Sequence, residues 1–167
     1  SDGRASSHTY VDSGLGALPR LTQWSLCVRF QQLHGGQPAT IFSYTNGTAF
    51  EELNLAIKWP SGEVLVMCCN YHIHQYIQVP VHLFTWHHLC VAAHLPNDTL
   101  HLAFDNKTWQ LGAKRAESET TPASAAVRPN GRFVLGQNIN LDAEWDVTQA
   151  FHGYLADFRL YNVALPL

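Results

Sequence analysis

The sequence predicts an all-β protein, folded as an antiparallel sandwich of two sheets. About ten or more short segments rich in β-branched, aliphatic and aromatic residues follow one another, and turns with Gly, Pro, Asn or Asp separate them. Neither the periodicity of an amphipathic helix nor a repeat of fixed length occurs between them. Strands without intervening helices pair as antiparallel neighbours, and their apolar faces are buried when two sheets pack together.

Two segments form the predicted centre of the sandwich. Trp24–Phe30 and Trp86–Ala93 are runs of apolar, β-branched and aromatic residues without Pro or Gly, and each has one cysteine in its middle. Both are typical of strands buried on at least one face. If Cys27 and Cys90 are bonded, two strands far apart in the sequence become neighbours, and closing that loop contributes roughly 4 kcal/mol in the chain-entropy model.

The other strands of the first half are separated by clear turn signals. An extended piece at His8–Val11 is predicted to end at the glycines and the proline of residues 14–19. Glycine and proline at 35–38 and 60–62 mark two further turns. The strands around them are Ala39–Tyr44, Leu53–Trp59, Val64–Cys69 and Tyr71–Val79, and alternate residues of the last one face the same way.

The second half continues the same pattern around one long loop. Its strands, separated by turns at 96–98, 105–107 and 130–131, are Thr99–Phe104, Thr108–Leu111, Arg132–Leu135 and Gly153–Val163. Residues 113–129 differ from the rest, because they are small, polar and interrupted by proline. We therefore predict a long surface loop there.

Length and composition indicate one globular domain of 167 residues, large enough to bury a core. Charged residues make up 14% and the net charge is −3, so we expect neither nucleic acid nor an anionic membrane as a partner. No apolar run approaches the roughly 20 residues that a membrane helix needs. The polar start Ser1–Arg4 is typical of a mature terminus or an excised fragment.

Three glycosylation sequons indicate the secretory pathway. They begin at Asn46, Asn97 and Asn106, each at a predicted turn or strand end where an acceptor must be exposed. Together with the separated pair of cysteines, they favour an extracellular protein over a cytosolic one.

Several motifs resemble the pentraxin domain in their order and spacing. They are Thr9–Val11, Leu21–Phe30, Phe42–Tyr44, His88–Cys90, Leu135–Gln137, Thr148–Gly153 and Phe158–Leu165, and they span almost the whole chain. The resemblance implies the jelly-roll sandwich that pentraxins share with laminin-G domains and with legume-type, concanavalin-like lectins. It also implies a disulfide between Cys27 and Cys90.

Departures from the pentraxin pattern indicate a divergent member. The family signature is His-x-Cys-x-Ser/Thr-Trp; here His88 and Cys90 match, but Ala92 and Ala93 replace the last two residues. The chain also stops where the family adds a helix and further strand. We therefore expect residues 1–167 to form a single pentraxin-like domain without the C-terminal helix. Degenerate domains of this kind resemble those at the amino ends of adhesion G-protein-coupled receptors and in other multidomain proteins of the plasma membrane.

The resemblance further implies a calcium site built from oxygen donors of two loops. Asn138 and Asn140 stand where the family has acidic ligands, and Gln149 matches the family's glutamine. Glu52 and Asp142 complete the candidate set for one weakly held ion. Because amides in place of carboxylates remove ligand charge, the expected affinity is low. The alternative is a polar loop that binds no metal at physiological calcium.

Histidines offer a second candidate metal site. His72 and His74 lie two apart in a predicted strand and point to one face, as zinc ligands can. Since the spacing brings no defined set of four ligands together, we expect a surface histidine face rather than a zinc site. His88, which matches the family position, is predicted to be a packed, hydrogen-bonded core residue.

Cys68 and Cys69 are adjacent, and in an alternating strand one thiol faces the core and the other faces outward. A bond between neighbouring cysteines is strained and rare. Two interpretations remain open: an inert buried thiol beside a half-exposed one, or a bridge from one of them to another chain or to a cysteine outside this fragment.

The sequence thus predicts a non-catalytic extracellular recognition module of an adhesion receptor. Its partner would be a protein or glycan ligand of the matrix or cell surface, or a second copy of the chain. Residues 71–84 and 137–149 are the two candidate surfaces. The alternative function is a secreted calcium-dependent lectin or opsonin of the pentraxin type. We expect no enzyme, since hydrolase, phosphate-loop and zinc-protease motifs are missing from the sequence and no pair of carboxylates is placed across a cleft, as a glycosidase requires.

Overall fold

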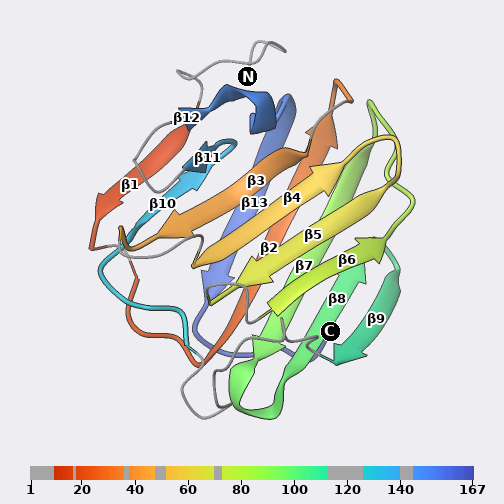
Figure 1. The fold of residues 1–167 in the computed structure, drawn as a ribbon. Coiled ribbons are helices and arrows are strands. Elements are labelled where there is room, and N and C mark those ends of the chain that lie inside the picture. The colour runs from red at the N-terminus through yellow and green to blue at the C-terminus, as the bar shows by residue number, and fades with distance from the viewer. Residues whose placement is uncertain are drawn as a thin grey trace.

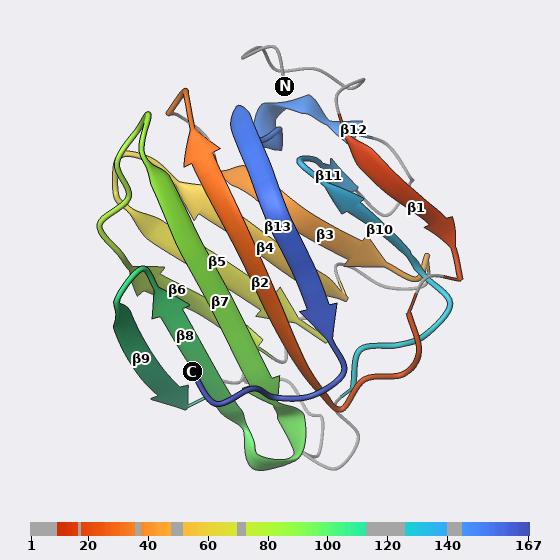
Figure 2. The same ribbon diagram turned by 180° about the vertical axis from the view of Figure 1, so that it is seen from behind.

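Two antiparallel sheets lie face to face in the computed structural model of the chain, and the apolar core fills the space between them (Figure 1). The structure describes residues 10–16, 18–35, 38–47, 52–69, 73–112, 126–139 and 145–167. Seen from behind, the five-stranded sheet lies in front of the six-stranded one (Figure 2). The two-sheet, all-β sandwich that the strand pattern predicted is confirmed.

The strand order places the first strand of the chain at the edge of one sheet and the last strand at the edge of the other. The six-stranded sheet runs β1 (Val11–Leu15), β10 (Arg132–Leu135), β3 (Ala39–Thr45), β4 (Leu53–Lys58), β5 (Glu63–Cys68) and β6 (Ile73–Gln78). The five-stranded sheet runs β13 (Gly153–Tyr161), β2 (Gln23–Gln32), β7 (Trp86–His94), β8 (Thr99–Phe104) and β9 (Lys107–Gly112). A short hairpin of β11 (Asn138–Ile139) and β12 (Trp145–Asp146) lies beside β3.

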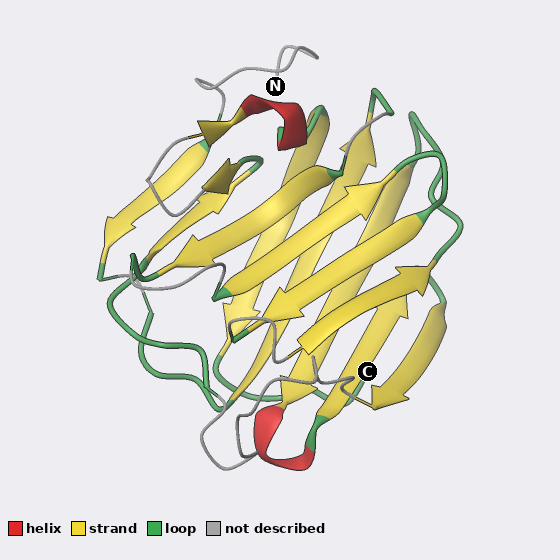
Figure 3. Cartoon of the chain, in the orientation of Figure 1, coloured by secondary structure: helices red, strands yellow, loops and turns green. Residues whose placement is uncertain are grey.

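Helix is confined to short turns in the described part of the chain. The turns η1 (Leu95–Asn97) and η3 (Val147–Gln149) lie at opposite ends of the sandwich (Figure 3). No helix within the described ranges has the length and apolar character needed to cross a membrane.

The strands β2 and β7 are neighbours in the middle of the five-stranded sheet. Alternate residues of β2 from Trp24 to Phe30 are at most 1% exposed and belong to the core. Cys27 lies opposite Cys90 in the register, and their sulfurs are bonded at 2.05 Å. The structure thus contains the disulfide that the resemblance to pentraxins implies.

The buried histidine of β7 is His87 rather than the predicted His88. His87 is 3% exposed, and its Nδ1 lies 2.9 Å from a carboxylate oxygen of Asp105. Successive residues of a strand point to opposite faces, and Leu89 and Val91 face the core. His87 shares their face, so His88 is exposed on the other side of the sheet.

The first strand begins where the predicted extended piece ends. β1 runs from Val11 to Leu15 against β10, with a shift of register between Asp12 and Leu15. Gly14 lies at this irregularity with φ 70°, a left-handed conformation that glycine adopts without a steric penalty. The glycine predicted to end the strand instead accommodates a bulge within it.

The predicted surface loop 113–129 ends earlier than expected. Residues 113–125 lie outside the described residues, whereas Ala126 and Val127 are only 8% and 0% exposed. Val127 exchanges two backbone hydrogen bonds with Leu21, at 3.0 and 2.9 Å. The prediction was wrong for these residues because it rested on the average composition of the segment, and two apolar residues at its end are enough to anchor it.

Candidate recognition face

Aromatic side chains gather at one end of the outer face of the five-stranded sheet. Residues of β13, β2 and β7 lie in one row there, because Tyr154 pairs with Gln31 and Gln31 pairs with Trp86. Tyr154 is 50% exposed and Trp86 is 42% exposed. Their ring centroids are 6.4 Å apart and their planes are tilted by 30°, so the two rings border a shared apolar surface.

Arg29 lies in the next row and adds a positive charge beside the rings. Its guanidinium carbon is 5.6 Å from the centroid of the Trp86 ring, within the range of a cation–π contact. The same guanidinium lies 3.6 Å from the carboxylate of Asp157, and both charged side chains are half exposed. A cation and an anion therefore border the rings, where each can also pair with a group on a ligand.

Phe84 extends this surface from the turn that precedes β7, and it is 67% exposed. Its carbonyl accepts a hydrogen bond from Gln31 Nε2 at 2.7 Å, and its N–H donates to the carbonyl of Gln32 at 2.8 Å. These two bonds hold the turn against the end of β2. We call the set of Arg29, Gln31, Phe84, Trp86 and Tyr154 the Trp86–Tyr154 face.

The composition of the Trp86–Tyr154 face is that of a binding surface. Single exposed apolar residues are common on proteins, but a group of large rings that pack on one another at the surface marks an interaction site. Trp, Tyr and Arg are also the residue types that most often dominate the free energy of binding between proteins. The core does not need these side chains, so a partner is the simplest reason for their placement.

Sequence reasoning found one member of this face and missed the rest. Phe84 lies at the end of the predicted surface 71–84, whereas Tyr76 lies on β6, at the edge of the other sheet. Arg29 and Trp86 could have been suspected, because each occupies an outward position in a strand whose other face is apolar. Tyr154 could not have been suspected from the sequence, since its place beside Trp86 depends on the pairing of β13 with β2.

The predicted histidine face is described only in part. His72 lies outside the described residues, and His74 is half-buried with its ring 5.2 Å from that of Tyr76. Among the residues that the structure describes, the group with metal-type donors is Cys27, His88 and Cys90, whose two sulfurs are already joined in the disulfide. That group therefore supplies no thiolates to a metal, and the absence of a zinc site stays a prediction.

The candidate calcium donors of the 137–149 segment bond to protein groups. Asn138 Nδ2 donates to Gln149 Oε1 at 3.3 Å, and Asn138 Oδ1 accepts a hydrogen bond from Asn54 Nδ2 at 3.2 Å. Asn140 and Asp142 lie outside the described residues. Two amides of the predicted set are thus adjacent, as the resemblance implies, and each is engaged by a neighbouring side chain.

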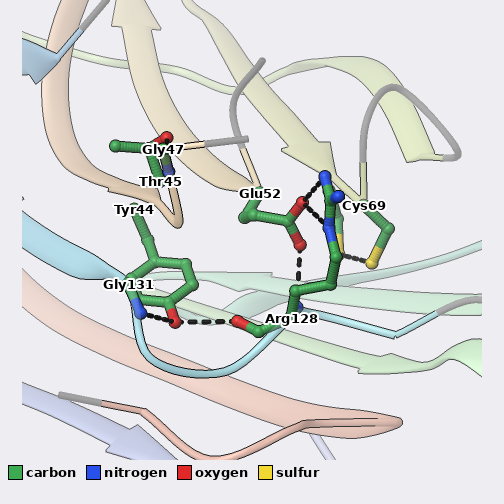
Figure 4. Close-up of polar contacts among 8 residues, drawn as sticks. Tyr44, Thr45, Gly47, Glu52, Cys69, Arg128 and Gly131 are labelled. Carbon is green, nitrogen blue, oxygen red and sulfur yellow. Dashed lines mark hydrogen bonds and ion pairs between the residues drawn. The ribbon is translucent and has the colours of Figure 1, made fainter. Parts of the chain in front are cut away.

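Glu52, the carboxylate predicted for the same site, forms an ion pair with Arg128, whose side chain is partly exposed (Figure 4). Glu52 is 0% exposed. It accepts hydrogen bonds from the backbone N–H of Arg128 at 2.8 Å, from its Nε at 2.6 Å, and from its terminal nitrogen. A buried carboxylate is tolerated when it is paired and hydrogen-bonded in this way. Glu52 therefore holds the 126–129 segment in place through its ion pair with Arg128.

Tyr44 ties the same segment to β3. Its hydroxyl donates to the carbonyl of Arg128 at 2.7 Å and accepts from the N–H of Gly131 at 2.8 Å. Burial raises the pKa of Tyr44, which keeps the hydroxyl protonated and able to donate. A β-carbon on Gly131 would lie 2.4 Å from the carbonyl oxygen of Thr45, so only glycine fits this approach.

Cys68 ends β5, and Cys69, which follows it, lies beside this ion pair (Figure 4). Cys68 is 0% exposed and Cys69 is half-buried, so one thiol faces the core and the other is partly open, as predicted. Their sulfurs are 2.6 Å apart.

The three predicted glycosylation acceptors lie at strand ends. Asn97 ends η1 and Asn106 lies in the turn between β8 and β9, and both side chains are exposed. Asn46 follows β3 directly and is half-buried. Their occupancy stays a prediction.

Comparison with known sequences gives a consistent family assignment. The family described as the pentaxin family matches residues 3–167. The neuronal pentraxin receptor of Rattus norvegicus is 32% identical over 154 residues, which cover 89% of this chain and 29% of that protein. Human neuronal pentraxin-2 is 26% identical over 151 residues, covering 89% of this chain and 32% of that protein. The chain thus spans about a third or less of the length of these curated relatives.

Comparison with solved structures shows the same fold. The heptameric SAP-like pentraxin from Limulus polyphemus superposes with a TM-score of 0.75 at 16% identity, covering 99% of this chain and 76% of that one. The full extracellular region of zebrafish Gpr126 superposes with a TM-score of 0.65 at 14% identity, covering 98% of this chain and 20% of that one. The pentraxin-type jelly roll is confirmed by these likenesses.

Proposed function

Because the chain belongs to the pentraxin family, we propose that it is a non-catalytic extracellular recognition module of a cell-surface adhesion receptor, and that it binds its ligand through the Trp86–Tyr154 face. Pentraxins are binding proteins without enzymatic activity. The observation that carries the proposal is the exposed pair of Trp86 and Tyr154 rings, with Arg29 beside them and Phe84 at their border.

The residue types favour a protein ligand of the matrix or of a neighbouring cell. Trp and Tyr supply large contact areas at a small cost in conformational entropy, and Arg adds charged hydrogen bonds at the same place. The face also lies across three strands that are paired into one rigid sheet, so little ordering is needed on binding. A second copy of the chain and a glycan remain alternative partners, and the tests below separate them.

A receptor of the adhesion G-protein-coupled class is the parent protein we favour. Support comes from the shared fold of the zebrafish Gpr126 extracellular region and from the neuronal pentraxin receptor as a relative. In such a receptor the domain would stand outside the plasma membrane with its sheets exposed to partners.

Calcium is expected to bind weakly, at one site at most. Asn138 and Gln149 would hold it, and they offer only amide oxygens, which supply no charge to the ion. Isothermal titration calorimetry with calcium should give a dissociation constant of about 10⁻³ M or no measurable heat, in the weakest range of extracellular calcium modules. Tight binding of more than one ion would contradict this and would support the secreted calcium-dependent lectin instead.

Cell binding tests the proposed function. The chain, secreted with its glycans and coupled into tetramers, is applied to a panel of cells, with calcium or with a chelator. We expect binding that is equal in both conditions and is lost when the cells are treated with protease. Binding lost in chelator would favour the lectin, and binding lost only on glycosidase treatment would identify a glycan ligand. Light scattering that shows dimers of the untethered chain would identify the second copy as the partner.

A further inference from the structure

We propose that Cys68 and Cys69 form a redox-active modification site, at which the neighbouring thiols close to a vicinal disulfide in an oxidising environment and reopen on mild reduction. Their sulfurs lie 2.6 Å apart (Figure 4). Non-bonded heavy atoms attract one another at roughly 3.5–4.0 Å, whereas a disulfide bond is about 2.05 Å long. The two sulfurs are therefore already well inside the distance of an ordinary contact. The proposal is independent of the ligand that the Trp86–Tyr154 face binds.

The backbone explains how neighbouring side chains meet. Two adjacent residues of a regular strand point to opposite faces, so their sulfurs would be far apart. Cys68 still belongs to β5, where it pairs with Leu53 and Ile73. Cys69 has left the strand and adopts a left-handed φ of 58°, which is uncommon for a residue other than glycine. Its N–H donates to the carbonyl of Glu52 at 2.8 Å, which holds the turn in this conformation.

The two thiols differ in what they can react with. Cys68 is fully buried, and that burial, together with the neighbouring thiol of Cys69, raises the pKa of Cys68 well above its usual range. Cys68 is therefore a neutral thiol near neutral pH. Cys69 is half-buried, so its sulfur is the one that an external reagent reaches first.

The oxidation is a thiol–disulfide exchange with a low-molecular-weight disulfide, such as glutathione disulfide. The sulfur of Cys69 gives up its proton and attacks one sulfur of that disulfide, which forms a mixed disulfide and releases a thiolate that takes up a proton. The sulfur of Cys68 then attacks the sulfur of Cys69 and displaces the second thiolate, which takes up the proton that Cys68 loses. One external disulfide is reduced to two thiols while two cysteine thiols are oxidised, so atoms and electrons balance.

The proposed bond between Cys68 and Cys69 should be reduced under conditions that leave the Cys27–Cys90 disulfide intact. The Cys27–Cys90 bond spans 63 positions of the chain, so breaking it releases a large amount of chain entropy and is opposed by the stability of the fold. A bond between adjacent residues closes no such loop and adds little stability of this kind. The vicinal bond is therefore the labile one of the two.

Differential alkylation tests this assignment. The chain is secreted from mammalian cells, denatured without reductant and treated with N-ethylmaleimide, and the peptide with both residues is weighed. We expect an unlabelled peptide, lighter than the dithiol form by the mass of two hydrogens. After brief treatment of the folded protein with a small amount of dithiothreitol, both cysteines should be labelled while the peptides of Cys27 and Cys90 stay joined. Two labels before any reduction would overturn the proposal.

Two variants keep the test decisive. Cys69→Ser and Cys68→Ser each remove one partner, so the remaining cysteine should take up one maleimide without reductant. If the buried Cys68→Ser is not secreted, Cys69→Ser decides alone, because its position is half-buried and tolerates a hydroxyl. A wild-type chain that runs as a disulfide-linked dimer, and loses the dimer in Cys69→Ser, would replace the vicinal bond by an intermolecular bridge.

Discussion

Replacing Cys27 and Cys90 together by alanine is expected to lower the free energy of unfolding by about 4 kcal/mol. The disulfide joins the two central strands across 63 positions of the chain, so its loss gives that much conformational entropy back to the unfolded state. A domain has roughly 5–15 kcal/mol of net stability, so this loss is between about a quarter and four fifths of the total. Urea unfolding followed by tryptophan fluorescence measures the change.

The matched control for this variant is the double replacement of Cys68 and Cys69 by alanine. Those residues are adjacent, so a bond between them restricts the unfolded chain very little. We expect the control to retain most of the stability of the wild type and the Cys27/Cys90 variant to lose about 4 kcal/mol. A midpoint of urea unfolding that is the same in wild type and in the Cys27/Cys90 variant would show that the bond does not stabilise the sandwich.

Arg128→Met is expected to cost about 1.5–3 kcal/mol of stability, because it removes the charged hydrogen bonds to the buried Glu52 carboxylate, while the exposed side of Arg128 leaves solvent nearby. Glu52 is 0% exposed and takes both a backbone and side-chain hydrogen bonds from Arg128. The measurement is urea unfolding of the variant and the wild type at neutral pH.

Glu52→Gln combined with Arg128→Met separates the charge from the packing. In the double variant no charge is buried, so we expect the stability to return toward the wild-type value. A single Arg128→Met variant as stable as the wild type at neutral pH would mean that solvent reaches the carboxylate, and that the ion pair does not anchor the 126–129 segment.

Much of the fold could be predicted because the pattern of apolar residues within a strand indicates which of its side chains are buried. In β2 the alternation from Trp24 to Phe30 fixes which side chains face the core, and Arg132–Leu135 is a strand with the predicted bounds. Local patterns failed where a tertiary contact decides the outcome. Val127 lies at the end of a polar run, yet it is buried because its backbone pairs with that of Leu21. The prediction for β7 was likewise wrong by one residue, because His87 rather than His88 is buried.

The candidate sites were harder to predict than the fold. Glu52 could not be distinguished from a calcium ligand in the sequence, because its partner Arg128 lies 76 positions away. The Trp86–Tyr154 face was missed except for Phe84 for the same reason, since its other residues come from three strands. The contact between Cys68 and Cys69 depends on a left-handed conformation at Cys69, and nothing in the sequence predicts that conformation for a cysteine.

Binding of the Trp86→Ala/Tyr154→Ala variant, compared with wild type and with Tyr76→Ala on the same cells, tests the central claim most directly. Tyr76 is 55% exposed and lies on β6 of the other sheet, so its variant removes an equally exposed ring from a different place. We expect the double variant to lose at least about tenfold in affinity, as truncated hot-spot residues do, and Tyr76→Ala to bind like wild type. Equal binding by all three proteins, with unchanged unfolding curves, would contradict recognition through this face.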